Sequence, residues 1–168
     1  ALSMIISEDN KWKLNFASGR YFKIPTYTSL GYKNSNNIFL NKNSQYTRSD
    51  HLVGGIEFNW TESSRLTFEA FYKKYNNYPI SAVDKVSLAN KGADFEVLGN
   101  EEIITSGKGK SYGLEFLYQQ KLKNNFYGIL SYTFFYSKFS GLDNIYLPSV
   151  WDNRHILSFT GGYKLKRN

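Results

Sequence analysis

The side chains best suited to chemistry are few in this sequence, and they lie far apart. His51 and His155 are the two histidines, and the chain contains no cysteine. A zinc site needs several nitrogen, sulfur or oxygen ligands at a characteristic spacing, and neither histidine has that spacing to the other. The absence of cysteine also excludes thiol catalysis and a disulfide scaffold. We therefore expect neither a metal site nor a cofactor.

One short run, Asp152-Asn153-Arg154-His155, combines an acid, a cation and an imidazole. Nucleophilic catalysis would need a serine that is activated by a base within reach, and no nucleophile-elbow sequence occurs in the chain. His155 is expected to face outward beside a loop, where a structural role is the simpler interpretation. The sequence therefore predicts no catalytic residue and no enzyme activity.

The elements that position these side chains are predicted to be strands. In residues 11–22, for example, Trp12, Leu14 and Phe16 alternate with polar or small neighbours. Successive side chains of a strand point to opposite faces, so such a segment has one apolar and one polar face. The same alternation recurs in segments 2–6, 11–22, 51–60, 65–75, 111–122, 126–137 and 154–165. We expect an all-β protein of about seven strands.

The predicted connections alternate in length. Short polar turns at 8–10, 61–64 and 123–125 alternate with long segments at 23–50, 76–110 and 138–153, which hold all three prolines. Short turns at one rim and long loops at the other are typical of a transmembrane β-barrel. Barrel strands can cross lipid because closure pairs every backbone N–H and C=O group. We therefore predict an antiparallel up-and-down meander, a segment of such a barrel, in which sequence neighbours pair as hairpins.

The apolar face of these strands carries aromatic residues near the strand ends. Trp and Tyr favour a membrane–water interface because the ring is apolar while its polar tip stays wet. The predicted interface aromatics are Trp12, Trp60, Tyr136 and Tyr163. The opposite face is too polar to pack against a second sheet, and a polar inside with an apolar outside is the barrel pattern.

Two sets of residues are candidates for a functional surface. The lumen-facing candidates are the charged residues Arg65, Glu57, Glu69, Lys73, Glu115, Lys121 and Arg154. They could line a path or bind a domain inside the barrel, or they could simply pair across strands and stay hydrated. The ligand-loop candidates are Tyr27, Tyr32, Tyr46, Tyr78 and Tyr146. Their rings could stack on a ligand or pack the loops against one another.

The net charge of +7 does not indicate a nucleic-acid partner. A clustered basic patch or run marks such proteins, whereas here no block of Lys and Arg is longer than two residues, as at Lys73-Lys74. Most of these charges alternate with apolar residues along strands, which favours hydrated or lumen-facing positions. No stretch of 18 or more apolar residues occurs, so the sequence predicts no transmembrane helix.

Several motifs follow one another in an order that resembles a known family. Residues 109–115, GKSYGLE, open a strand, and the tight turn at 122–128 follows. The runs SYT at 131–133 and WDNRHIL at 151–157 come next, and residues 14–22 with Pro25 precede them all. This succession resembles the later barrel strands of TonB-dependent outer-membrane receptors, particularly those of Bacteroidetes.

The resemblance implies a barrel of about 22 strands that holds a plug domain in its lumen. It further implies an N-terminal TonB box that couples the plug to inner-membrane energy. The implied cargo is a siderophore, a vitamin or a glycan. The implied partners are outer-membrane lipid, the plug domain and the TonB complex, in the outer membrane of a Gram-negative bacterium. Residues 1–168 would supply about a third of the barrel, without the plug, the TonB box or the remaining strands.

We expect the chain to be a piece of a longer protein, because it begins with a strand-like apolar segment and ends just after another strand. The free strand edges of such a piece would promote oligomerisation. Two alternatives stay open. One is a small self-contained outer-membrane barrel with a structural or adhesive role. The other is a soluble carbohydrate-binding β-domain, which would need apolar inner faces on two packed sheets.

Overall fold

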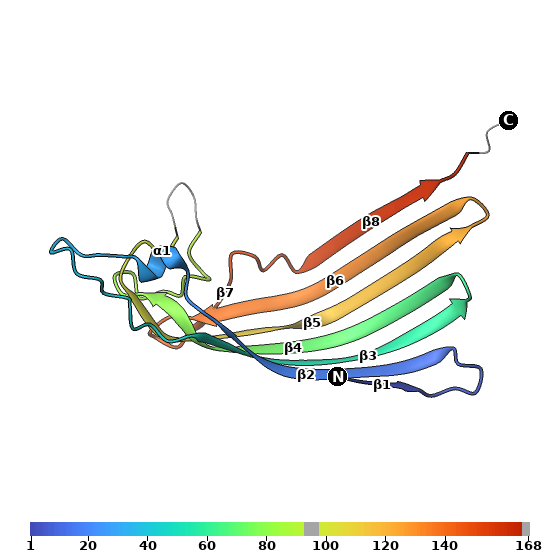
Figure 1. Cartoon of the computed structure of the whole chain (residues 1–168), viewed down its shortest axis with the longest axis horizontal. Helices are drawn as coiled ribbons and strands as arrows, with labels where there is room; N and C mark the ends of the chain where they lie inside the picture. Colours follow the sequence, from blue (N-terminus) through green and yellow to red (C-terminus); the bar gives the residue numbers. More distant parts are fainter. Residues whose placement is uncertain (93–97, 166–168) are drawn as a thin grey trace.

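The computed structural model describes residues 1–92 and 98–165. They form one antiparallel sheet of eight strands, with a short helix among the loops at one end (Figure 1). The elements are β1 Leu2–Ile5, β2 Trp12–Lys23, α1 Tyr27–Leu30, β3 Thr47–Thr61, β4 Ser64–Ser81, β5 Ile103–Lys123, β6 Phe126–Ser140, β7 Tyr146–Pro148 and β8 His155–Tyr163. The predicted all-β antiparallel meander is confirmed.

Strand order follows the sequence from β1 at one edge to β6, which pairs on its far side with both β7 and β8. The three predicted hairpins form, β1 with β2, β3 with β4 and β5 with β6. The strands of the described residues all belong to this one sheet, which is open. The two packed sheets that a soluble carbohydrate-binding β-domain would need are therefore not formed by these residues.

The predicted loop 138–153 contains a short extra strand, β7, before the last predicted strand, and this accounts for eight strands where about seven were expected. β7 pairs with residues 138–140 of β6, and β8 pairs with residues 126–134 of the same strand. Six residues, 149–154, therefore lie opposite the three residues 135–137. Arg154 has a positive φ of 57°, and its carbonyl accepts a hydrogen bond from the Phe135 N–H. The ladder to β6 thus resumes immediately after the insertion.

The middle strands are longer than the alternation predicted. β4 extends to Ser81 and β5 begins at Ile103, although the sequence pattern ended at 75 and resumed at 111. Irregular pairing between Asn76 and Ile80 hides the extension from a simple two-residue period. Gly109 lies in this added part of β5, where a Cβ atom would collide with the Phe139 ring. Residues 76–81 and 103–110 of the predicted loop are therefore strand.

The strand register divides the side chains between two faces. On the first, which we call the aromatic face, Trp12 of β2 stacks on Phe58 of β3 with ring centroids 4.3 Å apart. Nearer the long loops, Tyr72, Tyr112 and Tyr136 stand side by side on β4, β5 and β6, and we call them the tyrosine row. Between these levels lie Leu14, Phe16, Ile56, Phe68, Leu114, Phe116, Phe134 and Leu157. The opposite face, which we call the polar face, carries the predicted lumen charges other than Arg154.

The buried apolar residues lie outside the middle of the sheet. Ile80, Leu88, Ala89, Ile103 and Phe139 form the buried apolar core, at the end that carries the long loops. Along β2, by contrast, residues of the aromatic face are exposed and their polar neighbours are half-buried. Within the described part of the chain, no helix is long and apolar enough to cross a membrane.

Candidate functional site: the polar face and the loop cluster

A chain of polar contacts crosses four strands on the polar face. Lys13 Nζ of β2 lies 3.2 Å from the Glu57 carboxylate of β3, and an Arg65 nitrogen of β4 lies 3.4 Å from the same carboxylate. Arg65 also donates a 2.7 Å hydrogen bond to Gln119 Oε1 of β5. The Glu57 side chain is only 13% exposed, so two cations compensate a largely buried charge. These contacts fit the alternative in which lumen charges pair across strands.

A second pair of acidic residues on this face lacks such compensation. Glu69 of β4 and Glu115 of β5 lie directly opposite each other in the register. Among the described residues, neither carboxylate has a cation within 4.0 Å. Like charges directly opposite each other destabilise a sheet. This pair is therefore the part of the polar face that would gain most from a cationic partner.

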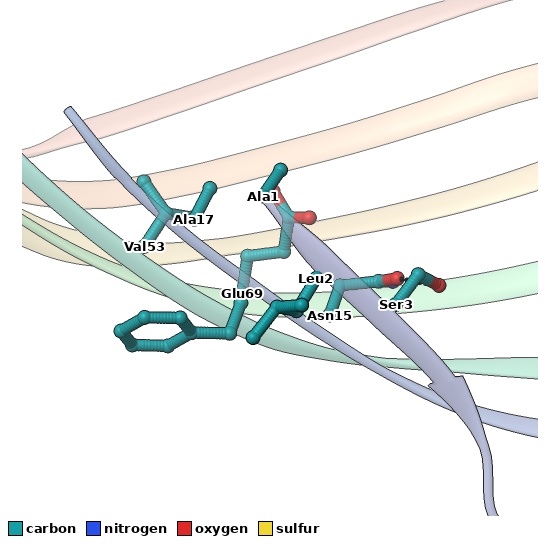
Figure 2. A pocket seen from close by; sticks show the side chains of 8 residues that line it. Ala1, Leu2, Ser3, Asn15, Ala17, Val53 and Glu69 are labelled. Atoms are coloured by element: carbon teal, nitrogen blue, oxygen red, sulfur yellow. Dashed lines mark hydrogen bonds between the residues drawn. The ribbon is translucent and has the colours of Figure 1, made fainter.

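The polar face is hollowed beside these carboxylates. A hollow of about 220 Å³ lies at the first edge of the sheet, where Glu69 of β4 lies with Ala17 and Val53 of β2 and β3 (Figure 2). Gly55 has no side chain at this place, and a Cβ atom there would lie 2.6 Å from Glu69 Cγ. A second hollow, of about 310 Å³, is lined by Glu57, Arg65, Glu69 and Glu115 among others. The charged side chains thus border open space.

The two predicted lumen lysines lie towards opposite ends of the polar face. Lys73 pairs in register with His51 of β3 and Ser111 of β5. Its Nζ lies 5.1 Å from the ring centroid of Phe71. Lys121 is exposed beside the short turn, where its N–H bonds to the Ser63 carbonyl.

Arg154 does not join this face. Its guanidinium lies 3.9 Å from the ring centroid of Tyr136, which belongs to the aromatic face, and 3.3 Å from the buried Asp152 carboxylate. The prediction extended strict alternation from β8 back to residue 154. The insertion at 149–154 and the positive φ of Arg154 turn the chain there, so the alternation does not extend that far. The lumen-facing prediction for Arg154 is wrong.

The five predicted loop tyrosines are dispersed. Tyr27 begins α1 and is largely exposed, Tyr46 is exposed just before β3, and Tyr32 is half-buried after α1. Tyr78 lies in β4, where its ring centroid is 4.5 Å from that of Phe139 in β6. Tyr146 lies in β7 on the aromatic face, with Lys110 Nζ 4.7 Å from its ring centroid. Tyr78 and Tyr146 are therefore strand residues, contrary to their predicted loop positions.

The aromatic residues predicted for the membrane interface all lie on the aromatic face. Trp12, Trp60 and Tyr163 are exposed at the short-turn end, on β2, β3 and β8. Tyr136 lies in the tyrosine row at the other end. His155 also faces this side, and its Nδ1 lies 2.7 Å from the Tyr132 hydroxyl. It therefore shares the face of the predicted interface aromatics.

We call the segments 24–46, 82–92 and 98–102, with the buried core residues beside them, the loop cluster. Asn41 joins several of its parts, although no sequence motif marks this residue. Its buried amide nitrogen donates hydrogen bonds of 2.8 Å and 2.7 Å to the carbonyls of Ser29 and Glu101. Its amide oxygen accepts a 3.0 Å bond from the Ile103 N–H. One side chain therefore holds α1, the loop after β4 and the start of β5 together. These partners are up to 62 residues away along the chain, so no local motif marks them.

A charged group closes the other side of the same cluster. Lys91 Nζ lies 2.6 Å from the Asp84 carboxylate and 2.7 Å from that of Glu101, and Ser81 donates a hydrogen bond to Glu101. Burial alone would lower the pKa of Lys91, but hydrogen bonds to the two carboxylates outweigh it and raise that pKa. The hydrogen bond from Lys91 lowers the pKa of Asp84. Lys91 and Asp84 therefore stabilise each other's charged forms.

The loop cluster encloses little free volume. A cavity of about 130 Å³ lies between Pro25, Ser29, Tyr78 and Leu88. Small-molecule sites usually measure roughly 300–1,000 Å³, so this cavity is too small for one. In the described residues, no group of three or more His, Cys, Asp or Glu side chains could hold a metal ion. The hollows beside the charged residues of the polar face are larger than this cavity.

These features define a class of structure, an open antiparallel wall with one aromatic and one polar face. No protein-family model matches the sequence, and no curated protein matches it. Solved structures do match. The chain aligns with the FpvAI–pyocin S2 complex at a TM-score of 0.63 and 16% identity, over 98% of this chain and 20% of that chain.

Two further matches carry more descriptive names. One is the ferripyoverdine receptor of the outer membrane of Pseudomonas aeruginosa bound to ferripyoverdine, and the other is the pyoverdine outer membrane receptor FpvA from Pseudomonas aeruginosa PAO1 bound to pyoverdine. Both align at a TM-score of 0.60 and 16% identity over 94% of this chain, and over 19% and 21% of their own chains. The chain thus spans about a fifth of the solved chains it matches. The likeness is one of fold, that of a section of a receptor barrel.

Proposed function

We propose that the chain forms a section of the barrel wall of a TonB-dependent active-transport receptor in a Gram-negative outer membrane. The aromatic face carries this proposal, because its apolar side chains are exposed and the tyrosine row bounds them at one end. On β6 the stretch from Phe126 to Tyr136 contains eleven residues. A tilted barrel strand needs about 9–11 residues to cross a membrane. The fold of the matched receptors supports the same proposal.

The polar face would then border the lumen of the complete barrel. The Glu69–Glu115 pair, which has no cation within 4.0 Å among the described residues, would accept a cationic side chain of a plug domain. The lumen would carry a siderophore, a vitamin or a glycan, with the TonB complex as the energy-coupling partner. The chain itself would act as a wall and not as an enzyme. A bacteroidetal origin stays a prediction from the sequence.

Tryptophan fluorescence tests the membrane part of the proposal. The chain is added to neutral phosphatidylcholine vesicles whose acyl chains carry bromine, which quenches nearby tryptophan. Single-tryptophan variants keep either Trp12 or Trp60, and the matched control keeps Trp151, which packs against Phe139 at the long-loop end. We expect strong quenching of Trp12 and Trp60 and weak quenching of Trp151. Equal quenching of the three tryptophans would contradict the proposal. A chain that stays monodisperse in solution and does not bind the vesicles would contradict it as well.

The reading frame that contains this sequence tests the receptor part. We expect it to encode a secretion signal, a plug domain and further barrel strands before Ala1. A frame with none of these would contradict the receptor and favour the small outer-membrane barrel instead. The two tests are independent, because a wall section inserts into lipid whichever receptor it belongs to.

A further inference from the structure

A belt of positive charge lies immediately beyond the tyrosine row on the aromatic face. One step further along the strands, the register aligns Arg20, Asp50, Lys74, Lys110 and Lys138 across β2 to β6. The next level on the same face adds Arg48 and Lys108. We call these seven residues the basic belt. Since their side chains share the face of Tyr72 and Tyr136, they point away from the polar face.

The charges within the basic belt do not balance. Six of its residues are cations, and Asp50 is its one carboxylate. Asp50 lies 2.5 Å from Arg20 and 3.4 Å from Arg48, so it is already shared by the two arginines. Among the described residues, none of the four lysines has a carboxylate within 4.0 Å. Neighbouring strands lie about 4.8 Å apart, so the lysines are held close together without compensation.

An apolar trough runs up to this belt from the centre of the aromatic face. It has a volume of about 440 Å³, and Tyr72, Tyr112, Leu114, Phe134 and Tyr136 line it together with Lys110. Lys138 Nζ lies 5.8 Å from the ring centroid of Tyr136, and Lys110 Nζ lies 4.7 Å from that of Tyr146. Two lysines therefore stand over aromatic rings at the end of an apolar surface. A lipid has this same sequence of parts, an acyl chain followed by a charged headgroup.

We propose that the basic belt binds the phosphate headgroup of an anionic lipid, with an acyl chain of that lipid in the trough. The inference rests on the proposed function, because the aromatic face must be in contact with a bilayer. Tyrosine side chains mark the level at which hydrocarbon meets headgroups, and the belt lies one level beyond them. Each Lys or Arg near an anionic membrane surface strengthens binding appreciably. The occupant is a lipid and not free phosphate, because only a lipid also fills the apolar trough.

Vesicle flotation tests the proposal on the full chain. Association is measured with neutral phosphatidylcholine vesicles and with vesicles that also contain a phosphatidic acid. The belt variant replaces Lys74, Lys110 and Lys138 with Gln. The matched control removes the same charge elsewhere by replacing the exposed Lys42, Lys121 and Lys123 with Gln. We expect the wild-type preference for anionic vesicles to fall roughly 10- to 100-fold in the belt variant and less than about 3-fold in the control.

The outcomes separate the two proposals. A wild-type chain that does not associate with neutral vesicles overturns the proposed function and this inference with it. A chain that associates with neutral vesicles but shows no anionic preference, or whose two triple variants lose it equally, overturns this inference alone. Inorganic phosphate at millimolar concentration is added in a parallel arm. Loss of the preference in that arm, under constant ionic strength, would identify a free-phosphate site and overturn the lipid assignment.

Discussion

The loop cluster and the aromatic face use similar side chains in opposite ways. In the loop cluster Phe139 and Ile80 are each 1% exposed, packed under their own chain. On the aromatic face Phe16 and Phe68 are 47% and 46% exposed, and nothing in the described chain covers them. Burial in the first region is supplied by the protein, and in the second it must be supplied by the surroundings. In the described residues, the buried apolar core therefore lies at the long-loop end. The apolar side chains of the aromatic face can be buried only by what surrounds the sheet.

The largest expected effect comes from removing the centre of the loop core. Replacing Phe139 with Ala deletes contacts with Tyr75, Tyr78 and Trp151, so we expect the free energy of unfolding to fall by about 3–5 kcal/mol. Phe68→Ala on the aromatic face is the matched control. Denaturant titration in detergent micelles measures both variants. Equal losses would mean that the two regions are not buried differently.

A charge on each face of β5 sharpens the comparison between the two sides of the sheet. Leu114 belongs to the aromatic face and Glu115 to the polar face. Leu114→Arg should make membrane insertion less favourable by about 2–4 kcal/mol, whereas Glu115→Arg should be tolerated. The yield of folded chain in lipid vesicles measures this difference. Similar yields for both variants would refute the assignment of the faces.

The hydrogen bonds of Asn41 offer a polar counterpart to the Phe139 test. Asn41→Ala leaves the Ile103 N–H without its partner in a buried place, at a cost of about 1–3 kcal/mol. The exposed Asn43→Ala serves as the control. Hydrogen exchange at the Ile103 amide should accelerate in the first variant and stay unchanged in the second. Acceleration in both would point to a general loosening of the loops.

The two carboxylate environments of the polar face predict effects of opposite sign. Glu57→Gln removes the partner of Lys13 and Arg65, so stability should fall by about 0.2–1 kcal/mol. Glu69→Gln relieves the repulsion from Glu115, so stability should rise by a similar amount. Chemical denaturation of both variants in the same detergent measures the signs. A loss in both would show that Glu69 already has a compensating partner.

The smallest expected effect is a pH dependence in the loop cluster. Because the pKa of Asp84 is lowered in the folded chain, its stabilising contribution is present above the ordinary Asp value near 4 and is lost as pH falls through the lowered value. Asp84→Asn should therefore speed hydrogen exchange at Leu88 slightly at pH 7. The difference from wild type should vanish in strong acid. A difference that persists there would have another origin.

Local patterns account for the parts of the fold that the sequence predicted. Strand alternation and short turns are encoded within a few residues, so the hairpins and both faces followed from them. The loop cluster depends on contacts such as Asn41 with Ile103, which no local period contains. The ends of β4 and β5 were missed because irregular pairing breaks the period.

The candidate site was predictable to a similar extent. Register confirms that Glu57, Glu69 and Glu115 share one face, because alternation within a regular strand fixes the side of each residue. Arg154 was misplaced because alternation says nothing across an insertion. Whether Glu57 and Glu69 have cationic partners depends on which residues lie opposite them on the neighbouring strands. That register cannot be predicted from the sequence of one strand alone.

The strand directions at the two edges of the sheet limit how the sheet can be extended. With β7 and β8 taken as one interrupted strand, β1 and β8 both run towards the short-turn end, and every pairing observed in the described sheet is antiparallel. Joining these two edges, or joining two copies head to tail, would create a parallel seam with a different hydrogen-bond pattern. A closed barrel in which every neighbouring pair is antiparallel contains an even number of strands. Such a barrel would therefore need an odd number of strands in addition to these seven. Any strand that pairs antiparallel with β1 or β8 must run in the opposite direction to them, from the short-turn end to the long-loop end.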